Sequence, residues 1–437
     1  MSRIIKLFTT IRNNWKKSVV GAAAFTYGVN YGIESYDTEQ LMREYCEEAA
    51  KFGAQPLRTS IPPRHVTVIL NPVAKKRKAK KLFEKYCEPL LHLAGISVTI
   101  IQTESEGQAR SLIENLETPT DAIIVAGGDG TLADVVTGLM RKYSTNLGNV
   151  KKCPIGVLPL GQTNRLADSL FEDYNELADV HKMADATMAV VRGATKAIDA
   201  VEVQPLEKDP ENDIKPVYAV GIIEWGAWRD AESRVNKYWY WGYLRKYVTY
   251  IFTGYKKDVN WDCNATVRYS EPCHGCSRCY KELHSTEETN TTRRWWQAFL
   301  PRKVVHATGP DYSKIVNDKC GELHELPISA TELHLTTDNI ENVDPHTPPS
   351  IKLQLGPETI SYTDFIAEGW RRVRGDNKPT LNEALRAKQI ELIPNKAENF
   401  GDKEQMFSID NDEFELKPLK IRLLSKAVTI FCSQLES

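Results

Sequence analysis

A short segment of the chain combines glycines with an acidic residue where a strand is expected to meet a helix. The apolar run Ala122 to Ala126 predicts a buried strand of a parallel sheet. It leads into Gly127-Gly128-Asp129-Gly130-Thr131, and a helix is predicted next by apolar residues at helical spacing, Leu132, Val135, Val136, Leu139 and Met140. Glycines let a backbone approach phosphate closely, and the free N–H groups of a helix start favour anions. The segment therefore predicts a phosphate-binding loop at the carboxyl end of a strand.

The carboxylate of Asp129 is unusual among phosphate-binding glycines because its charge repels the ligand. It indicates either a magnesium ion or a base that takes a proton from an attacking hydroxyl. Gly-Gly and Asp-Gly also occur in tight turns without any function. Three glycines around an acid at a strand end favour the functional interpretation. We also expect Thr131 and Asp134 to form a capping pair in the first turn of the helix.

The chain resembles the lipid kinases related to diacylglycerol and sphingosine kinases. Gly127 to Thr131 is similar to their GGDGT signature, and four other segments match in the family's order. These are Val66 to Leu70 with the turn Asn71-Pro72, Thr103 after the strand Val98 to Ile101, Pro159 to Asn164 after the strand Ile155 to Leu158, and Ser408 to Asp412 where the family has "D-G-E". Within this family the likeness is greatest to the mitochondrial acylglycerol kinases, and it extends to about Cys432.

The resemblance implies an ATP-dependent and Mg²⁺-dependent kinase that phosphorylates monoacylglycerol and diacylglycerol to lysophosphatidic and phosphatidic acid. It makes Asp129 and Asp410 the catalytic candidates, although Asp410 lies in a turn-prone stretch and fits a hairpin turn equally well. Asp199, Trp225 and Arg229 are the candidates for the lipid site, with a buried structural acid as the alternative for Asp199. The nucleotide-binding candidates are Asn71, Pro72, Thr103, Gly127, Gly128, Gly130, Thr131, Asp134, Gly161, Thr163 and Asp412.

Several positions depart from the family's pattern. Asn411 and Asp412 replace the Gly and Glu of "D-G-E", and Arg165 stands where diacylglycerol kinases often have Asp. Thr163 replaces the second glycine of the "G-T-G" loop. Because threonine tolerates positive φ poorly, we expect this loop to be placed differently.

The resemblance and the strand pattern together predict two domains and a basic N-terminal segment. Residues 1–60 form a targeting and membrane-anchor segment with a linker helix, residues 61–196 a nucleotide-binding α/β domain with a mostly parallel sheet, and residues 197–437 a lipid-binding β-sandwich, with the nucleotide cleft between the domains. Strands are expected at Ala197 to Val203, Pro216 to Ile223, Glu332 to Thr336, Ile351 to Leu355 and Leu419 to Leu424. Loops are expected at Leu206 to Lys215, Ser285 to Thr292, Thr337 to Ser350 and Arg371 to Lys388.

The N-terminal segment has the composition of an organellar address, since no acidic residue precedes Glu34. Ser18 to Ile33 is apolar but, at about 16 residues, shorter than the roughly 20 that span a bilayer. We expect an uncleaved anchor, followed by a helix from Thr38 to Phe52 that Gly53 ends. The resemblance implies the mitochondrial inner membrane, facing the intermembrane space, and a contact with the carrier translocase of that membrane.

Tyr238 to Tyr255 is rich in Tyr and Trp beside cations, a composition that suits a membrane interface. An amphipathic helix packed on the sandwich explains the same pattern, and we favour this second interpretation. Arg293-Arg294-Trp295-Trp296 is the better candidate for an exposed surface.

Cysteines crowd into one short run at Cys273, Cys276 and Cys279. With Cys263 or His274 as a fourth ligand they could hold a metal ion. Zinc ribbons, however, use two well-separated Cys pairs, so we favour a loop without metal. Cys46, Cys87, Cys153 and Cys432 lie in apolar contexts that indicate packing.

Composition limits the other classes of function. A formal net charge of −2 argues against a general nucleic-acid-binding protein. NAD kinase, which shares a GGDGT loop, and sphingosine or ceramide kinase remain the enzymatic alternatives. A mainly non-catalytic import scaffold is the alternative from another class.

Overall fold

The computed structural model describes residues 13–55, 62–105, 107–144, 150, 153–174, 176–207, 215–255, 263–279, 315–339, 347–374, 381–395 and 406–433. The basic aromatic segment Arg293 to Trp296 and the predicted loop Ser285 to Thr292 lie outside these residues.

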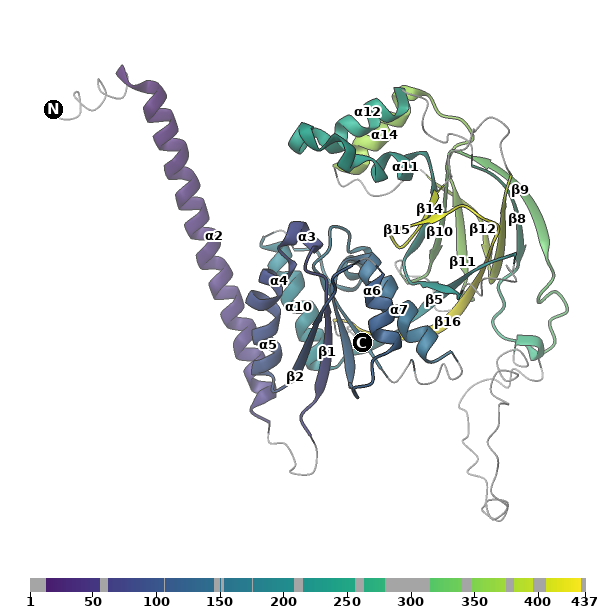
Figure 1. Ribbon diagram of the computed structural model, residues 1–437, viewed down its shortest axis with the longest axis horizontal. Coiled ribbons are helices and arrows are strands. Elements are labelled where there is room, and N and C mark those ends of the chain that lie inside the picture. Colours follow the sequence, from purple (N-terminus) through teal and green to yellow (C-terminus); the bar gives the residue numbers. More distant parts are fainter. Residues whose placement is uncertain are drawn as a thin grey trace, which may run out of the picture.

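The N-terminal half is built on four parallel strands in the order β2 (Ser97–Gln102), β1 (His65–Leu70), β3 (Ala122–Gly127) and β4 (Ile155–Pro159). All six residues of β3 are buried, as its apolar run predicts. Helices α5 (Glu88–Leu93) and α10 (Ala178–Arg192) lie on one side of this sheet, and α6 (Gln108–Glu114) and α7 (Asp129–Lys142) on the other (Figure 1). The predicted α/β domain is confirmed.

The C-terminal half is a sandwich of two mostly antiparallel sheets. One sheet has the order β12 (Asn382–Ala387), β11 (Ile351–Leu355), β10 (Glu332–Thr337), β7 (Ile222–Gly226), β14 (Met406–Ile409) and β15 (Asp412–Glu415). The other contains β5 (Thr195–Pro205), β6 (Val217–Ala219), β8 (Cys263–Ser270), β9 (His324–Ala330), β13 (Gln389–Pro394) and β16 (Leu419–Phe431). Apolar side chains from both sheets form one core, so the predicted sandwich is confirmed.

Strand β16 connects the two halves. Its first part pairs with β13, and near its end Ile430 lies opposite Ile155 of β4 in parallel register. The parallel sheet therefore continues into one sheet of the sandwich. This continuity fixes the carboxyl ends of β3 and β4 relative to the strands of the second domain.

Two local predictions in this half are wrong. The run Pro216 to Ile223 forms two strands, β6 and β7, because Val220-Gly221 breaks it. The stretch Arg371 to Lys388 is not one loop: it contains the end of α14 (Tyr362–Val373) and all of β12. Strand β12 lies at a sheet edge and only its last residue is buried, so it lacks the apolar alternation that reveals a strand.

A group of helices covers one end of the sandwich (Figure 1). It consists of α11 (Ala227–Ser233), the 3₁₀ segment η2 (Val235–Leu244), α12 (Arg245–Tyr255) and α14, and we call it the helical cap. Its core contains Trp228, Tyr250 and Phe365. A packed helix is found at α12, but it packs on α11 and α14 of the cap, whereas the prediction has it on the sandwich. For η2 the prediction is wrong, because Trp239 and Tyr243 are 73% and 91% exposed.

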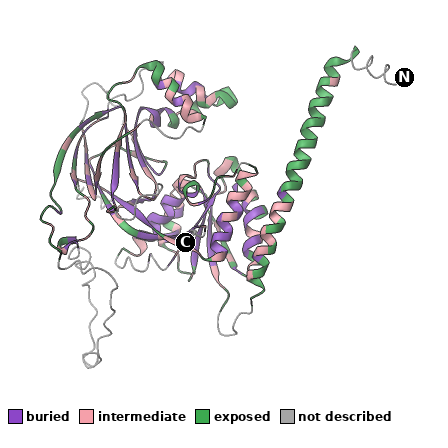
Figure 2. Ribbon diagram, turned by 180° about the vertical axis from the view of Figure 1, so that it is seen from behind, coloured by how far each residue is buried: buried purple, intermediate pink, exposed green. Residues whose placement is uncertain are grey.

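Helix α2 (Trp15–Gly53) is continuous across the predicted anchor segment and the predicted linker helix. Its C-terminal part packs on the α/β domain, where Arg192 forms an ion pair with Glu48 at 2.8 Å. Its N-terminal part extends away from the body of the protein and is exposed (Figure 2). Gly53 is its last residue, as predicted, and a Cβ there would lie 2.0 Å from the carbonyl oxygen of Leu93, so α2 can approach the end of α5 this closely only where the residue is glycine. Among the described residues, no helix combines the length and apolar character needed to cross a membrane.

Candidate active site

The glycine loop joins β3 directly to α7. Gly127 is the last residue of β3, Gly128 is the N-cap residue in an extended conformation, and α7 begins at Asp129. The predicted capping pair is therefore wrong, because Thr131 already lies within the first turn. The hydroxyl of Thr131 instead accepts a hydrogen bond from Nδ2 of Asn71 at 3.2 Å.

A second loop, after β4, packs against the glycine loop. A Cβ added to Gly161 would lie 2.2 Å from Cα of Gly128, so the two backbones can meet only where residue 161 is glycine. The carbonyl of Thr163 accepts the backbone N–H of Asp129 at 3.2 Å. Thr163 does not adopt a positive φ, so its β-branched side chain causes no backbone strain in this loop. In this position Thr163 braces the start of α7.

Asp129 lies between the starts of two helices. It begins α7, and its Oδ2 accepts the backbone N–H of Arg165, the first residue of α9 (Arg165–Leu170), at 3.2 Å. Burial raises the pKa of this carboxyl above its usual range, although hydrogen bonds from Arg165, Thr163 and Leu166 and the charge of Arg165 lower it in part. A carboxylate with a raised pKa binds a proton more readily, which suits a general base.

The turn between β14 and β15 carries the acidic motif that resembles "D-G-E". Asp410 and Asn411 both have positive φ, 47° and 77°, as a tight hairpin turn requires. Asparagine adopts this left-handed conformation more readily than most residues, which explains how Asn411 can replace the family's glycine.

Both carboxylate oxygens of Asp410 are hydrogen-bonded to backbone. Oδ1 accepts the N–H groups of Gly221 and Ile222 at 2.9 and 2.8 Å, and Oδ2 accepts that of Val220 at 2.8 Å. Burial is the largest influence on the carboxyl and raises its pKa to about 7; the three N–H groups lower it and the charge of Asp129 raises it. Asp410 therefore holds the segment 220–222 in place beside Asp129.

Asp412 brings the second domain to the start of α7. A Cβ added to Gly130 would lie 2.6 Å from Oδ1 of Asp412, so the missing side chain of this glycine leaves room for the carboxylate. Two acidic residues from different domains, Asp129 and Asp412, thus lie at the same helix start. Carboxylate oxygens are the ligands that Mg²⁺ takes in proteins, so this donor set fits such an ion.

A pocket opens between these elements. Its lining residues are Asp129, Leu132, Arg165, Leu166, Val220, Gly221, Ile222, Asp410 and Asn411. Arg165 is its cation, and Nη1 of this residue donates to Oε1 of Glu224 at 2.8 Å. The charge of Glu224 is the main reason that the pKa of Arg165 is raised above its usual range. The sequence analysis did not identify Arg165 as the cation of the pocket or Glu224 as its partner, because Glu224 is 59 positions from Arg165 and lies within an ordinary strand.

A row of alternating acidic and basic side chains continues from Glu224 towards the helical cap. His334 Nε2 lies 3.9 Å from Glu224 Oε1 and 2.8 Å from Glu332 Oε1. Glu332 accepts two hydrogen bonds from Arg372, both at 2.7 Å. Burial raises the pKa of Glu332, but Arg372 and His334 outweigh it and bring the pKa to about 2. The row therefore keeps Glu332 charged while buried and connects the pocket with the cap.

Other predicted nucleotide residues lie along the carboxyl edge of the parallel sheet. Thr103 follows β2, and its backbone N–H donates to the carbonyl of Leu70 at 2.9 Å; Asn71 and Pro72 follow β1. Asp134 differs from this group, since it lies further along α7 and forms an ion pair with Arg110 of α6 at 2.7 Å. This ion pair indicates that Asp134 links α6 to α7.

The three predicted lipid-site residues are not brought to the pocket. Oδ1 of Asp199 accepts the backbone N–H of Lys426 at 2.7 Å, in the irregular part of β16. Trp225 is buried in the sandwich core. Arg229 of α11 forms ion pairs with Asp230 and with Glu413 of β15. None of the three lines the pocket that contains Asp129.

Comparison with known proteins assigns this architecture to a family. Residues 65–203 match the diacylglycerol kinase catalytic domain, and residues 220–436 match the acylglycerol kinase C-terminal domain. The mitochondrial acylglycerol kinase of Homo sapiens is 36% identical over 97% of this chain and 96% of its own length, and that of Xenopus laevis is 33% identical over 99% and 96%. A diacylglycerol kinase structure from Bacillus anthracis aligns with 86% of this chain and 99% of its own at 14% identity and a TM-score of 0.47.

Both family matches meet in the pocket, since Asp129 comes from the first matched segment and Asn411 from the second. Together with the identity along nearly the whole chain, they show that this chain belongs to the acylglycerol kinase family of lipid kinases.

Proposed function

We propose that the chain transfers the γ-phosphoryl group of ATP to the free hydroxyl of monoacylglycerol and diacylglycerol, giving lysophosphatidic and phosphatidic acid. The observation that carries this proposal is the position of Asp129. It is a carboxylate with a raised pKa that lines the pocket between the glycine loop and the β14–β15 turn. The acceptor class follows the relatives, which are acylglycerol kinases by name.

Phosphoryl transfer depends on alignment and on neutralisation of charge more than on covalent chemistry by the protein. Asp129 accepts the proton of the attacking hydroxyl, and its burial increases its affinity for that proton. Arg165, which lines the same pocket, offers its guanidinium to phosphate oxygens, and Glu224 fixes the orientation of that group. The segment 220–222, held by Asp410, forms the opposite wall. Asp410 thus acts as a positioning residue in this scheme.

The nucleotide phosphates are proposed to lie over the glycine loop. Gly128 and Gly130 are partly exposed there, Gly127 is buried at the end of β3, and the start of α7 favours negative charge. Asn71, Pro72, Thr103, Thr131, Gly161 and Thr163 form the surrounding edge. Mg²⁺, when bound, neutralises charge on the β- and γ-phosphates. Asp412, which lies at the start of α7, is the residue that would hold it.

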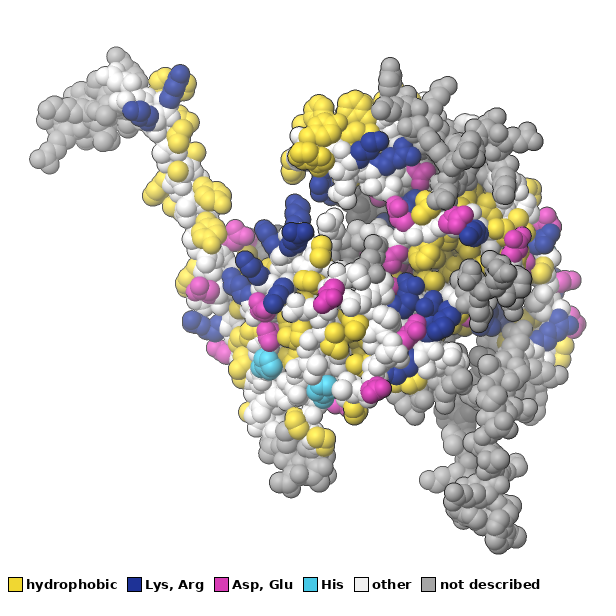
Figure 3. Space-filling model, in the orientation of Figure 1, with side chains coloured by type: hydrophobic (Ala, Val, Ile, Leu, Met, Phe, Trp, Pro, Cys, Tyr) yellow, Lys and Arg dark blue, Asp and Glu magenta, His cyan; other side chains and the backbone are white. Residues whose placement is uncertain are grey.

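An exposed aromatic surface supports a lipid acceptor. Trp239, Tyr240, Trp241, Tyr243 and Leu244 of η2 are all exposed, and we call them the aromatic patch. Figure 3 shows hydrophobic side chains gathered at this end of the helical cap, next to cationic ones. Exposed Trp and Tyr beside cations favour the interface of a bilayer. We propose that the aromatic patch docks on a membrane and brings the pocket to its substrate.

The exposed half of α2 extends towards the same side of the molecule as the aromatic patch (Figures 1 and 2). It carries apolar side chains that nothing in the described part of the chain covers, among them Phe25 and Tyr27, which are 73% and 74% exposed. This favours a second role, contact with membrane partners. We propose, following the relatives named mitochondrial, that the chain works at the mitochondrial inner membrane and contacts the carrier translocase there through α2.

A transfer assay with purified protein tests the enzymatic proposal. The chain is incubated with Mg²⁺, ATP labelled in the γ-phosphate, and one acceptor at a time: monoacylglycerol, diacylglycerol, sphingosine, ceramide or NAD. Label is expected in the two acylglycerol products. Label mainly in NAD phosphate or in a sphingolipid phosphate would contradict the proposed acceptor and support one of the alternatives.

Native electrophoresis of mitochondria tests the second role. A variant lacking residues 1–33 is expected to lose assembly with the translocase, and Asp129→Asn is expected to assemble normally. If Asp129→Asn is imported and folded but does not form the complex, assembly depends on catalytic turnover. This result would contradict the proposal that catalysis and assembly use separate surfaces.

A further inference from the structure

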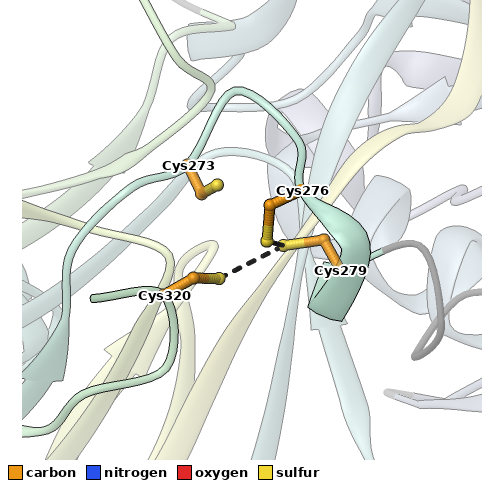
Figure 4. A group of neighbouring side chains, drawn as sticks. All are labelled: Cys273, Cys276, Cys279 and Cys320. Carbon is orange, nitrogen blue, oxygen red and sulfur yellow. Dashed lines mark hydrogen bonds between the residues drawn. The ribbon is translucent and has the colours of Figure 1, made fainter. Parts of the chain in front are cut away.

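Four cysteines meet beside the sandwich, far along the chain from the glycine loop. Cys273, Cys276 and Cys279 follow β8, and Cys320 precedes β9 (Figure 4). Their four sulfur atoms all lie within 4.8 Å of one another. The sequence suggested Cys263 or His274 as the fourth member, which is wrong for Cys263 because that thiol is buried in the sandwich core. Cys320, 41 positions beyond Cys279, takes this place.

The spacing of the sulfur atoms matches a single tetrahedral ion. A zinc ion bound by four thiolates at about 2.3 Å separates each pair of sulfurs by about 3.8 Å. The Sγ atoms of Cys276 and Cys279 are 3.8 Å apart, and those of Cys279 and Cys320 are 3.4 Å apart. An iron–sulfur cluster places its cysteines on different iron atoms, and this spreads the ligand sulfurs further than the observed group allows. We infer that Cys273, Cys276, Cys279 and Cys320 form a structural zinc site.

The neighbours of the sulfur atoms fit a set of thiolates. Nζ of Lys388 donates to Sγ of Cys279 at 3.3 Å, and Nδ2 of Asn317 donates to Sγ of Cys273 at 3.4 Å. Four thiolates carry more negative charge than one divalent ion neutralises, and the ammonium of Lys388 offsets part of the excess. Groups that donate to metal ligands in this way orient them and tune the metal.

The site also has a fixed backbone. Nη1 of Arg278 donates to the carbonyls of Cys320 and Asp318 at 2.9 and 3.1 Å, so one arginine ties the two halves of the cysteine group together. Cys276, Cys279 and Cys320 are buried and Cys273 is partly buried. Four thiolates leave no open coordination position, which is the arrangement of a structural zinc site.

The place of the site in the fold indicates its purpose. β8 and β9 are antiparallel partners, with Tyr269 opposite His324 at the end where the cysteines lie. A zinc ion there would link the segment that follows β8 to the segment that precedes β9. Closing this connection removes conformational freedom from the unfolded chain, as any covalent or metal cross-link does. The ion would therefore stabilise the sandwich without taking part in phosphoryl transfer.

Metal analysis of the full-length protein, purified under reducing conditions without added chelator, tests the site. We expect about one zinc ion per chain, as a closed four-thiolate site holds a single ion. Exchange for Co²⁺ should give the visible absorption of tetrahedral cobalt bound by thiolates. Cys320→Ser and Cys273→Ser should lose most of this zinc and lower the melting temperature, whereas Cys46→Ser, which changes a partly buried cysteine of α2, should keep both.

Two results would overturn the proposal. The first is wild-type protein that contains no zinc and whose four cysteines are found in two disulfide bonds by peptide mapping without reduction. Zinc retained at full stoichiometry by folded Cys320→Ser would show that the ion lies elsewhere. Because the wild-type measurements need no variant to fold, the proposal stays testable if the serine variants are unstable.

Discussion

The backbone N–H of Arg165 donates to Oδ2 of Asp129 at 3.2 Å, and this contact joins the two helix starts that border the pocket. It places a carboxylate and a guanidinium on the same wall, the first suited to take a proton and the second to hold phosphate oxygens. Glu224 reaches Arg165 from the sandwich, so both domains determine the position of the cation.

The first prediction concerns Arg165. Arg165→Ala is expected to lower kcat by about 10²-fold, in the range lost when one group that stabilises developing charge is removed. Arg165→Lys keeps the charge and should recover part of the loss. Steady-state kinetics with monoacylglycerol measure both variants. Arg141→Ala removes an arginine paired with Glu114 at the other end of α7 and serves as the control, with kcat unchanged. Equal kcat for Arg165→Ala and the wild type would exclude a role in the reaction.

The second prediction concerns the contact between the glycine loop and the loop after β4. A Cβ on Gly128 would lie 3.0 Å from the carbonyl oxygen of Thr163 and 3.1 Å from Cα of Gly161, so Gly128→Ala requires a shift of a few tenths of an ångström. Gly128→Glu adds a long charged side chain in the same place. We expect a moderate loss of ATP affinity for Ala and no measurable ATP binding or transfer for Glu, by calorimetry and activity assay. Near-normal ATP binding by folded Gly128→Glu would contradict the assignment of the glycine loop to the nucleotide site.

The sequence predicts the parts of this site that are local. The apolar run of β3, the glycines after it and the helical spacing of α7 lie within one segment, and the structure has all three. The helix start was misplaced to Thr131 because the bond that fixes it comes from Thr163, in another loop. Local capping patterns cannot include such a long-range contact.

Other features depend on contacts between distant segments. The pairing of Arg165 with Glu224 and the joining of Cys320 to Cys279 arise only once the strands are arranged. Strands β8, β13 and β14 are not among the predicted strands. Neither are β9, β12 and β15, many of whose residues are exposed and polar. The exposed aromatic patch was predicted as packed because composition alone does not say which side of a helix is covered.

The third prediction concerns pH and Asp410. The pKa of this carboxyl is about 7 in the folded protein, against a usual value of 3.8. Between these pH values the folded state binds more protons than the unfolded state, so the free energy of unfolding contributed by Asp410 decreases as pH rises from about 4 to about 7. Asp410→Asn, which cannot titrate, should show a flatter pH dependence of stability over this window. Denaturant unfolding at several pH values measures it, and an identical slope in wild type and variant would contradict the assignment.

The fourth prediction concerns the aromatic patch. Changing Trp239 and Tyr243 together to Ser should reduce sedimentation with lipid vesicles, because both side chains are largely exposed and support no core. kcat on detergent-dispersed monoacylglycerol should stay unchanged. Leu93→Ser, at an exposed position on α5, is the matched control and should bind vesicles normally. Undiminished vesicle binding by the double variant would move the membrane contact to another surface, with α2 the next to test.

The most direct test of the central claim compares wild-type protein and Asp129→Asn in the labelled transfer to monoacylglycerol, with Asp168→Asn, an exposed acid of α9 paired with Lys182, as the control. Wild type and control should form labelled lysophosphatidic acid at the same rate. Asp129→Asn should be slower by about 10²-fold or more, as expected for a lost general base, while its melting temperature stays near that of the wild type. A folded Asp129→Asn that retains more than about a tenth of wild-type kcat would contradict the assignment of Asp129 as the base.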